Sequence, residues 1–173
     1  MKHPAIHGLY AITDPALIPD RQLLPAAEAA LRGGARLLQY RDKTATPAQR
    51  RHRASQLQTL CRQYGALFLV NDDPALAAEI DADGVHIGQS DGGIARARRL
   101  LGPGKIIGVT CHSDLTLAEQ AAAAGADYVA FGAFFPTSTK QPRVRAEPEL
   151  LTWWRNTTTV PCVAIGGISV ENC

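Results

Sequence analysis

Amide and cationic side chains gather at the end of an apolar run in the stretch Leu37-Leu38-Gln39-Tyr40-Arg41-Asp42-Lys43. Successive side chains of a strand point to opposite faces, so a strand here places Gln39, Arg41 and Lys43 on one face. An amide and two cations at the carboxyl end of a strand are suited to holding a phosphorylated anion. A solvated strand end, whose charges only keep a sheet edge soluble, accounts for the same residues equally well.

Carboxylates form a second group. Asp72 follows the apolar run 67–70 within Asn71-Asp72-Asp73-Pro74, and Asp91 follows the run 84–88. Oxygen ligands that leave room for water and phosphate oxygens are typical of Mg²⁺ sites, so Asp72 and Asp91 are predicted metal ligands. Helix capping is the alternative, since Asp is favoured before the first residue of a helix, and it is the preferred interpretation of Asp73.

Hydroxyl groups and glycines form a third group. The stretch Pro136-Thr137-Ser138-Thr139-Lys140 offers three hydroxyls and an ammonium, which suit a phosphate, and it opens a long polar segment of the kind that forms lids. Gly166-Gly167 follow the last apolar run, where backbone N–H groups can approach a phosphate. A hydroxyl-rich loop without a ligand is the alternative. Thr110 is expected at a strand end with its hydroxyl toward the substrate, and His86 inside a buried strand.

Short apolar runs alternate along the chain with alanine-rich helical stretches. Strands are expected at 8–13, 36–41, 67–70, 84–88, 105–110, 128–132 and 161–165, and helices at 23–32, from 46, 75–80, 92–101, 115–124 and 149–155. Continuous apolar strands separated by helices predict a parallel sheet covered by helices, an α/β fold. Every polar group follows a strand, as the upper face of a TIM (β/α)₈ barrel requires. The chain is therefore expected to form one barrel domain over 1–173, C-terminally incomplete, with strand eight absent.

The composition restricts the class of protein. A chain of 173 residues that is 46% hydrophobic can bury one sizeable core. A net charge of +2 gives no indication of a nucleic-acid partner, and no apolar run is long enough to span a membrane. The four cysteines are widely separated and form no C-x-x-C pair, which favours a reducing compartment, and the cytoplasm is expected. A homo-oligomer is left open.

Taken together, these motifs resemble those of the thiamine phosphate synthase family. In chain order the matching stretches are Gln39-Tyr40-Arg41-Asp42-Lys43, Asn71-Asp72, His86-Ile87-Gly88-Gln89-Ser90-Asp91, Gly108-Val109-Thr110, Pro136 to Lys140, and Ile165 to Ile168. Each motif alone is weak. The resemblance is specific because it covers nearly the whole chain with the motifs in the right order.

The resemblance implies a TIM-barrel transferase that joins 4-amino-2-methyl-5-hydroxymethylpyrimidine diphosphate to a thiazole phosphate and releases pyrophosphate, with Mg²⁺ as cofactor. It implies that the pyrimidine diphosphate is held by Gln39, Arg41, Lys43, Asn71, Thr110 and Lys140, with Arg41, Lys43 and Lys140 also catalytic. Asp72 and Asp91 would bind the metal, and the thiazole phosphate would be held by Thr137, Ser138, Thr139 and Gly167. The alternatives are a thiazole tautomerase of the TenI type and an inactive ligand-binding or regulatory module on the same barrel.

Overall fold

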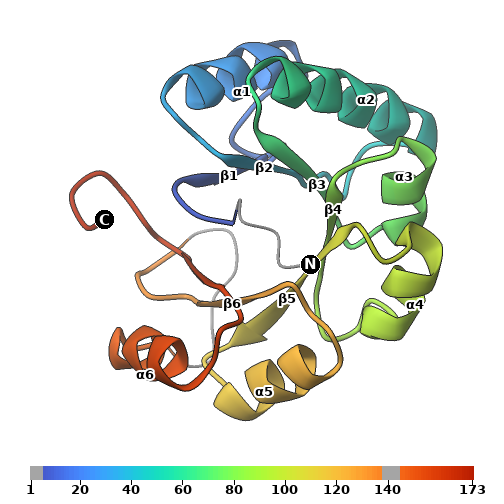
Figure 1. Ribbon diagram of the computed structural model, residues 1–173. Helices are drawn as coiled ribbons and strands as arrows, with labels where there is room; N and C mark the ends of the chain where they lie inside the picture. Colours follow the sequence, from blue (N-terminus) through green and yellow to red (C-terminus); the bar gives the residue numbers. More distant parts are fainter. Residues whose placement is uncertain (1–5, 138–144) are drawn as a thin grey trace. The chain divides into compact units, whose positions relative to one another are not determined.

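The computed structural model describes residues 6–137 and 145–173. Seven strands occur in these residues, and helices alternate with them along the chain (Figure 1). Contacts between residues divide the chain into two compact units. The first comprises residues 1–86 and 96–106, and the second comprises residues 87–95 and 107–173. Each unit contains parallel strands and the helices that follow them.

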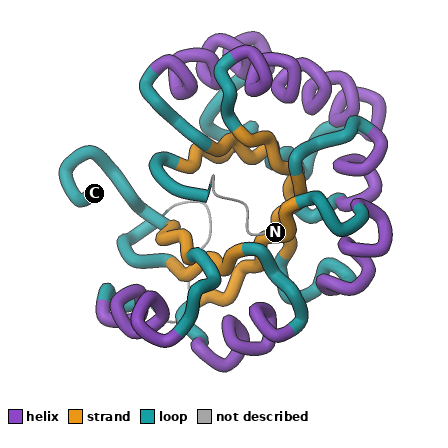
Figure 2. The backbone as a smooth tube through the Cα atoms, in the orientation of Figure 1, coloured by secondary structure: helices purple, strands orange, loops and turns teal. Residues whose placement is uncertain are grey.

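The first unit holds the strands β1 (Tyr10–Ile12), β2 (Leu37–Tyr40), β3 (Leu67–Asn71) and most of β4 (Gly84–Ile87). These strands pair in parallel in chain order. The helical segments of this unit are η1 (Asp20–Gln22), α1 (Leu23–Arg32), α2 (Pro47–Gln63), α3 (Pro74–Glu79) and the larger part of α4 (Gly93–Leu101). Helices α1 and α2 lie together on one side of the strands β1 to β3 (Figure 2).

The central strands of the first unit are buried on both faces. All four residues of β2 are buried, and Phe68, Leu69 and Val70 of β3 are at most 1% exposed. Burial of successive residues, which point to opposite faces, requires cover on both sides, as parallel strands normally have. The continuous apolar pattern therefore predicted the sheet type correctly.

Helix α2 begins with a capping box. The Thr46 hydroxyl accepts a hydrogen bond from the Gln49 N–H at 3.3 Å, and Gln49 Oε1 accepts one from the Thr46 N–H at 3.0 Å. Pro47 occupies the first helical turn, where its missing N–H costs nothing. The helix was expected from residue 46, and Thr46 and Pro47 fix the first turn of the helix that also supplies Arg53.

The second unit holds most of β5 (Ile106–His112), together with β6 (Tyr128–Gly132) and β7 (Cys162–Ile165), again parallel in chain order. Helices α5 (Leu115–Ala123) and α6 (Glu149–Thr157) connect these strands. Trp154 of α6 is buried edge-on against Phe131 of β6, with ring centroids 5.5 Å apart. Its indole N–H donates to the Val160 carbonyl at 2.9 Å, so the buried ring leaves no donor unpaired.

The expected elements agree with the observed ones to within two residues at each limit. The α/β class and the parallel pairing within each unit are confirmed. The single domain, the (β/α)₈ barrel and its missing eighth strand stay predictions. None of the described helices combines the length and the apolar character needed to cross a membrane.

Candidate functional site

The end of β2 carries the first predicted group. Gln39 is 2% exposed, and its amide nitrogen donates to the Tyr10 hydroxyl on β1 at 2.7 Å. The strand ends at Tyr40, so Arg41 and Lys43 lie in the segment that follows it. Strand alternation therefore does not set the direction of these two cations, as the sequence argument assumed; their own contacts do.

Arg41 is held by the end of β1. The Thr13 hydroxyl accepts from the Arg41 N–H at 2.9 Å and donates to the Arg41 carbonyl at 3.1 Å. The Arg41 guanidinium lies 3.3 Å from Asp14 Oδ2, and both side chains are largely buried. Thr13, the last residue of the expected strand 8–13, and Asp14, which follows it, were not among the predicted site residues. Their position at the carboxyl end of a strand adjacent to β2 is the signal that could have identified them.

Lys43 contacts one of the predicted metal ligands. Its Nζ lies 3.1 Å from Asp72 Oδ2, which joins the segment after β2 to the end of β3. Asp72 has a φ of +60°, in the left-handed region, and its N–H donates to the His86 carbonyl on β4 at 2.8 Å. An Asp in this conformation is uncommon, and such strained residues cluster at functional sites. The first unit thus brings together a predicted cation and a predicted carboxylate.

The competing capping interpretation is settled for the residues after β3. Asp73 is the N-cap of α3, because its Oδ1 accepts from the Leu76 N–H at 3.0 Å, and its other oxygen pairs with Arg50. Capping by Asp73 was the preferred interpretation and is confirmed. Asp72 is not the cap, so its carboxylate is not used for that purpose. Asn71 ends β3, in register with the buried His86.

A cavity of about 210 Å³ lies beside Arg41 in the first unit. Its walls come from the ends of β1 and β2, from the start of α1 and from α2. The lining residues are Thr13, Pro15, Ile18, Asp20, Leu23, Tyr40, Arg41, Asp42, Thr44 and Arg53. Charged side chains of both signs therefore surround the space next to a predicted catalytic cation.

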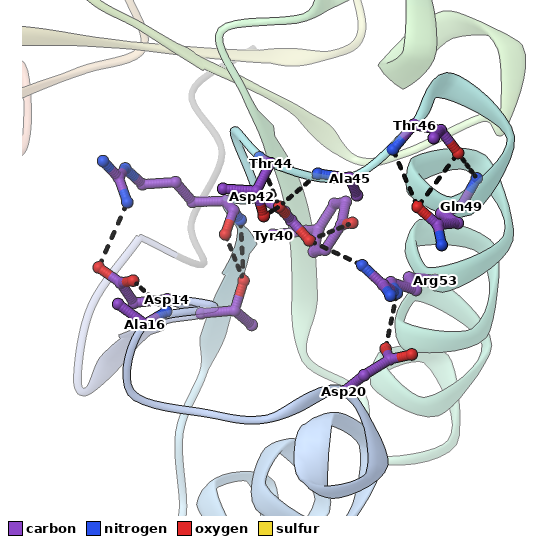
Figure 3. A network of polar contacts seen from close by, with 12 residues as sticks. Asp14, Ala16, Asp20, Tyr40, Asp42, Thr44, Ala45, Thr46, Gln49 and Arg53 are labelled. Atoms are coloured by element: carbon purple, nitrogen blue, oxygen red, sulfur yellow. Dashed lines mark hydrogen bonds and ion pairs between the residues drawn. The ribbon is translucent and has the colours of Figure 1, made fainter.

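Asp42, between the two cations in the chain, is the centre of a polar network that the sequence argument did not identify (Figure 3). Its Oδ1 accepts hydrogen bonds from the Thr44 N–H and hydroxyl, both at 2.9 Å, and from the Ala45 N–H at 3.0 Å. Its Oδ2 accepts from Arg53 at 2.9 Å. Burial alone would raise the pKa of Asp42, but the hydrogen bonds from Thr44 and Ala45, together with the Arg53 charge, outweigh it and lower the pKa.

A lowered pKa makes Asp42 a source of pH-dependent stability. The ionised carboxylate contributes fully above the ordinary pKa of Asp, and the contribution is lost as the pH falls through the lower pKa of the folded state. We expect Asp42→Asn to lower the free energy of unfolding at pH 7 by about 1–3 kcal/mol, the cost of weakening hydrogen bonds to a buried charged group. Urea unfolding at pH 7, 5, 4 and 3 should give a difference from wild type that shrinks below about pH 4. A difference that is the same at every pH would contradict this assignment.

The second unit carries the other predicted carboxylate. Asp91 Oδ2 accepts from the Gly88 N–H at 2.7 Å, which turns the segment after β4 back on itself. The Gln89 amide donates to the Thr110 carbonyl at 2.6 Å and so ties this segment to β5. A side chain at Gly88 would place its Cβ 2.9 Å from Asp91 Oδ2. The segment that carries Asp91 is therefore tied to the strand that carries Thr110.

Gly167 lies against the start of the predicted phosphate loop. Its φ is +67°, and a Cβ there would lie 2.4 Å from the Pro136 carbonyl oxygen. The Phe135 N–H donates to the Gly166 carbonyl at 3.0 Å, which anchors this approach. Only glycine fits, so the close contact explains the glycine pair after β7. Thr137 is described at the loop start, whereas Ser138, Thr139 and Lys140 lie outside the described residues.

The two predicted metal ligands, Asp72 and Asp91, are both carboxylates, a ligand type that suits magnesium better than a transition metal. Within residues 6–137 and 145–173, no cluster of three or more His, Cys, Asp or Glu side chains is arranged to hold an ion. Mg²⁺ rarely needs such a cluster, because one or two carboxylates suffice when substrate phosphates and water complete its coordination. Asp72 and Asp91 are carboxylates of this kind.

The two buried cysteines, Cys61 and Cys111, offer no nucleophile. Burial, with a smaller effect of the Asp114 charge, raises the pKa of Cys111 on β5 to about 12. Burial likewise raises the pKa of Cys61 on α2 to about 12, with Asp83 adding to it. The thiolate, which is the reactive form, is therefore almost absent from both residues at neutral pH.

Residues 9–173 match the family model described as thiamine monophosphate synthase. The chain is 66% identical to the thiamine-phosphate synthase of Alcanivorax borkumensis over 96% of this chain and 77% of that protein. It is 53% identical to the thiamine-phosphate synthase of Thioalkalivibrio sulfidiphilus, over 96% of this chain and 79% of the relative. Among solved structures, it is similar to a thiamine phosphate pyrophosphorylase from Pyrococcus furiosus, with a TM-score of 0.83 and 37% identity over 94% of this chain and 76% of that one.

Proposed function

Because the chain belongs to the thiamine monophosphate synthase family, we propose that it couples a pyrimidine diphosphate to a thiazole phosphate to give thiamine monophosphate and pyrophosphate. The observation that carries this proposal is the pairing of Lys43 with Asp72 at 3.1 Å. Lys43 lies two residues after Arg41, and Asp72 directly follows Asn71. A cation and a carboxylate from adjacent strand ends are what a diphosphate with its metal needs. A tautomerase does not bind a diphosphate and would not need this cation and carboxylate.

The chain's own residues are proposed to act mainly by electrostatics. Arg41, Lys43 and Lys140 neutralise the negative charge that develops on the diphosphate oxygens as the bond to the pyrimidine methylene carbon breaks. Gln39, Asn71 and Thr110 orient the pyrimidine diphosphate through hydrogen bonds. Asp72 and Asp91 would hold Mg²⁺, which would supply further positive charge to the diphosphate.

The thiazole phosphate is proposed to bind to Thr137, Ser138, Thr139 and Gly167. Hydroxyl and backbone N–H donors suit its phosphate, and holding the phosphate places the thiazole nitrogen at a high effective concentration for attack on the pyrimidine methylene carbon. The reaction is proposed to be dissociative: the bond to pyrophosphate breaks first, and the thiazole nitrogen then captures the pyrimidine cation. No protein nucleophile is needed, which agrees with the raised pKa values of Cys61 and Cys111.

The same proposal includes a (β/α)₈ barrel, phosphorylated small molecules as ligands, a cytoplasmic location and a homo-oligomer. The likeness to the Pyrococcus furiosus structure supports the barrel. The parallel strands within each unit, each followed by a helix, support it as well.

The test is product formation by the purified protein. With both phosphorylated substrates and Mg²⁺ present, we expect thiamine monophosphate and pyrophosphate in equal amounts. Conversion of a thiazole tautomer without any need for the pyrimidine diphosphate would instead identify the tautomerase. Saturable binding of a substrate without turnover would identify the inactive module, and either result would contradict the synthase proposal.

A further inference from the structure

The segment that carries Arg41 and Lys43 is held by a carboxylate inside it. Asp42 uses one oxygen to accept three hydrogen bonds from Thr44 and Ala45, which closes a tight turn directly after Lys43. The Asp42 side chain is only 5% exposed. A buried charge with this many partners fixes the backbone around it, because releasing any partner would leave the carboxylate poorly satisfied.

Arg53 on α2 clamps this turn from outside. Its Nη1 lies 2.9 Å from Asp42 Oδ2, and its Nε lies 2.6 Å from Asp20 Oδ1 in η1 (Figure 3). The guanidinium is planar and rigid, so binding two carboxylates through two different nitrogens sets the distance between the segments that bear them. The segment after β2, helix α2 and the segment before α1 are thereby joined at one point.

Neither Asp42 nor Arg53 is placed to act as the charge that binds the diphosphate. Asp42 has the wrong sign for an anion, and the Arg53 guanidinium is already shared between Asp42 and Asp20. By contrast, the Lys43 side chain is 58% exposed, and its terminal ammonium lies 3.1 Å from Asp72 Oδ2. The Lys43 side chain is flexible, so the position of its ammonium depends on the backbone, and the turn anchored by Asp42 fixes that backbone.

We propose that Asp42 and Arg53 are positioning residues that hold Arg41 and Lys43 in place for the diphosphate. This inference rests on the proposed function, since it assigns a role within that same site. Fixed donors stabilise developing charge without reorganising, and small displacements of such groups are costly in rate. The network would therefore affect catalysis as well as folding.

The experiment compares thiamine monophosphate formation by wild type, Arg53→Met, Lys43→Ala and the double variant. Methionine keeps an apolar chain of similar length but removes the guanidinium group that contacts Asp42 and Asp20. We expect Arg53→Met to lower kcat by about 10-fold, while KM changes much less. In the Lys43→Ala background the same substitution should lower kcat by no more than about 3-fold, because one of the two groups that Arg53 positions is already gone and only Arg41 remains.

A matched control lies two residues away on the same helix. Arg51 forms an exposed ion pair with Glu79 at 2.8 Å, and Arg51→Met should leave kcat unchanged. Arg53→Lys adds a second control, since one ammonium cannot reproduce two separately directed contacts and should restore only part of kcat. Equal kcat for wild type and Arg53→Met, or equal losses in both backgrounds, would overturn the inference.

Two further measurements keep the result interpretable. If Arg53→Met does not give a folded circular-dichroism spectrum, Asp20→Asn replaces it, because Asp20 is exposed and its loss leaves Asp42 paired with Arg53. Asp20→Asn should lower kcat about 3-fold.

The binding of pyrophosphate in the presence of Mg²⁺, measured by calorimetry, does not depend on turnover. The wild-type protein could bind pyrophosphate more tightly than Arg53→Met does and yet form no thiamine monophosphate. That result would refute the synthase proposal but support the positioning role of Arg53. If wild type and Arg53→Met form thiamine monophosphate equally fast and bind pyrophosphate with equal affinity, the positioning role is refuted and the synthase proposal stands.

Discussion

Lys43→Ala is expected to lower turnover by about 10²-fold, the usual effect of removing one fixed electrostatic donor from an active site. The ammonium lies 3.1 Å from Asp72, where the metal-bearing carboxylate and the diphosphate are proposed to meet. Because the Lys43 side chain is 58% exposed, loss of the pair should change the free energy of unfolding by less than about 1 kcal/mol. Steady-state kinetics and urea unfolding on the same preparation measure both quantities.

The control for Lys43 is a cation with a similar exposed ion pair and no proposed role. Arg51 pairs with Glu79 at 2.8 Å and is 63% exposed, so Arg51→Ala should show wild-type turnover. Lys43→Ala turnover within a few-fold of wild type would remove Lys43 from the proposed mechanism. A large loss of stability on Lys43→Ala would show that any loss of rate reflects folding instead.

The largest effect on metal dependence is expected from the two predicted ligands. Replacing Asp72 and Asp91 together with Asn should reduce the rate at saturating Mg²⁺ to that measured without the metal. Each single substitution should raise the Mg²⁺ concentration for half-maximal rate by at least about 10-fold, since even the partners of metal ligands matter by that much. Magnesium titrations of initial rate, with substrates saturating, measure this directly.

Asp73 provides the matched control, because it is adjacent in the chain and has a defined structural role. Asp73→Asn keeps a good N-cap for α3 and loses only the ion pair with Arg50, which is 3.0 Å long. Its magnesium titration should superimpose on that of wild type. An Asp72→Asn titration that also superimposes would exclude Asp72 as a ligand, and the same outcome for Asp91→Asn would exclude Asp91.

The local elements could be predicted because their signals are local. The continuous apolar runs of β2 and β3, the Thr46-Pro47 start of α2 and the limits of α1 all depend on residues a few positions apart. The motifs after each strand likewise identified the candidate residues, because the carboxyl ends of parallel strands lie at the same edge of a sheet.

Contacts between distant residues were not predictable in the same way. Alternation along β2 stops at Tyr40, so it could not indicate that Arg41 would pair with Asp14, 27 positions away, or that Lys43 would pair with Asp72. Asp42 looked like one charge among others in the sequence, yet in the structure it is buried and shared by Thr44, Ala45 and Arg53.

The sequence by itself therefore determined the order of strands and helices, the α/β class and which residue types follow each strand. Only the tertiary structure decided which carboxylate each cation contacts and that Asp42 and Arg53 join three segments. The physical reason is that strand and helix patterns arise from neighbouring residues, whereas ion pairs and buried networks depend on which segments folding brings within a few ångströms of each other.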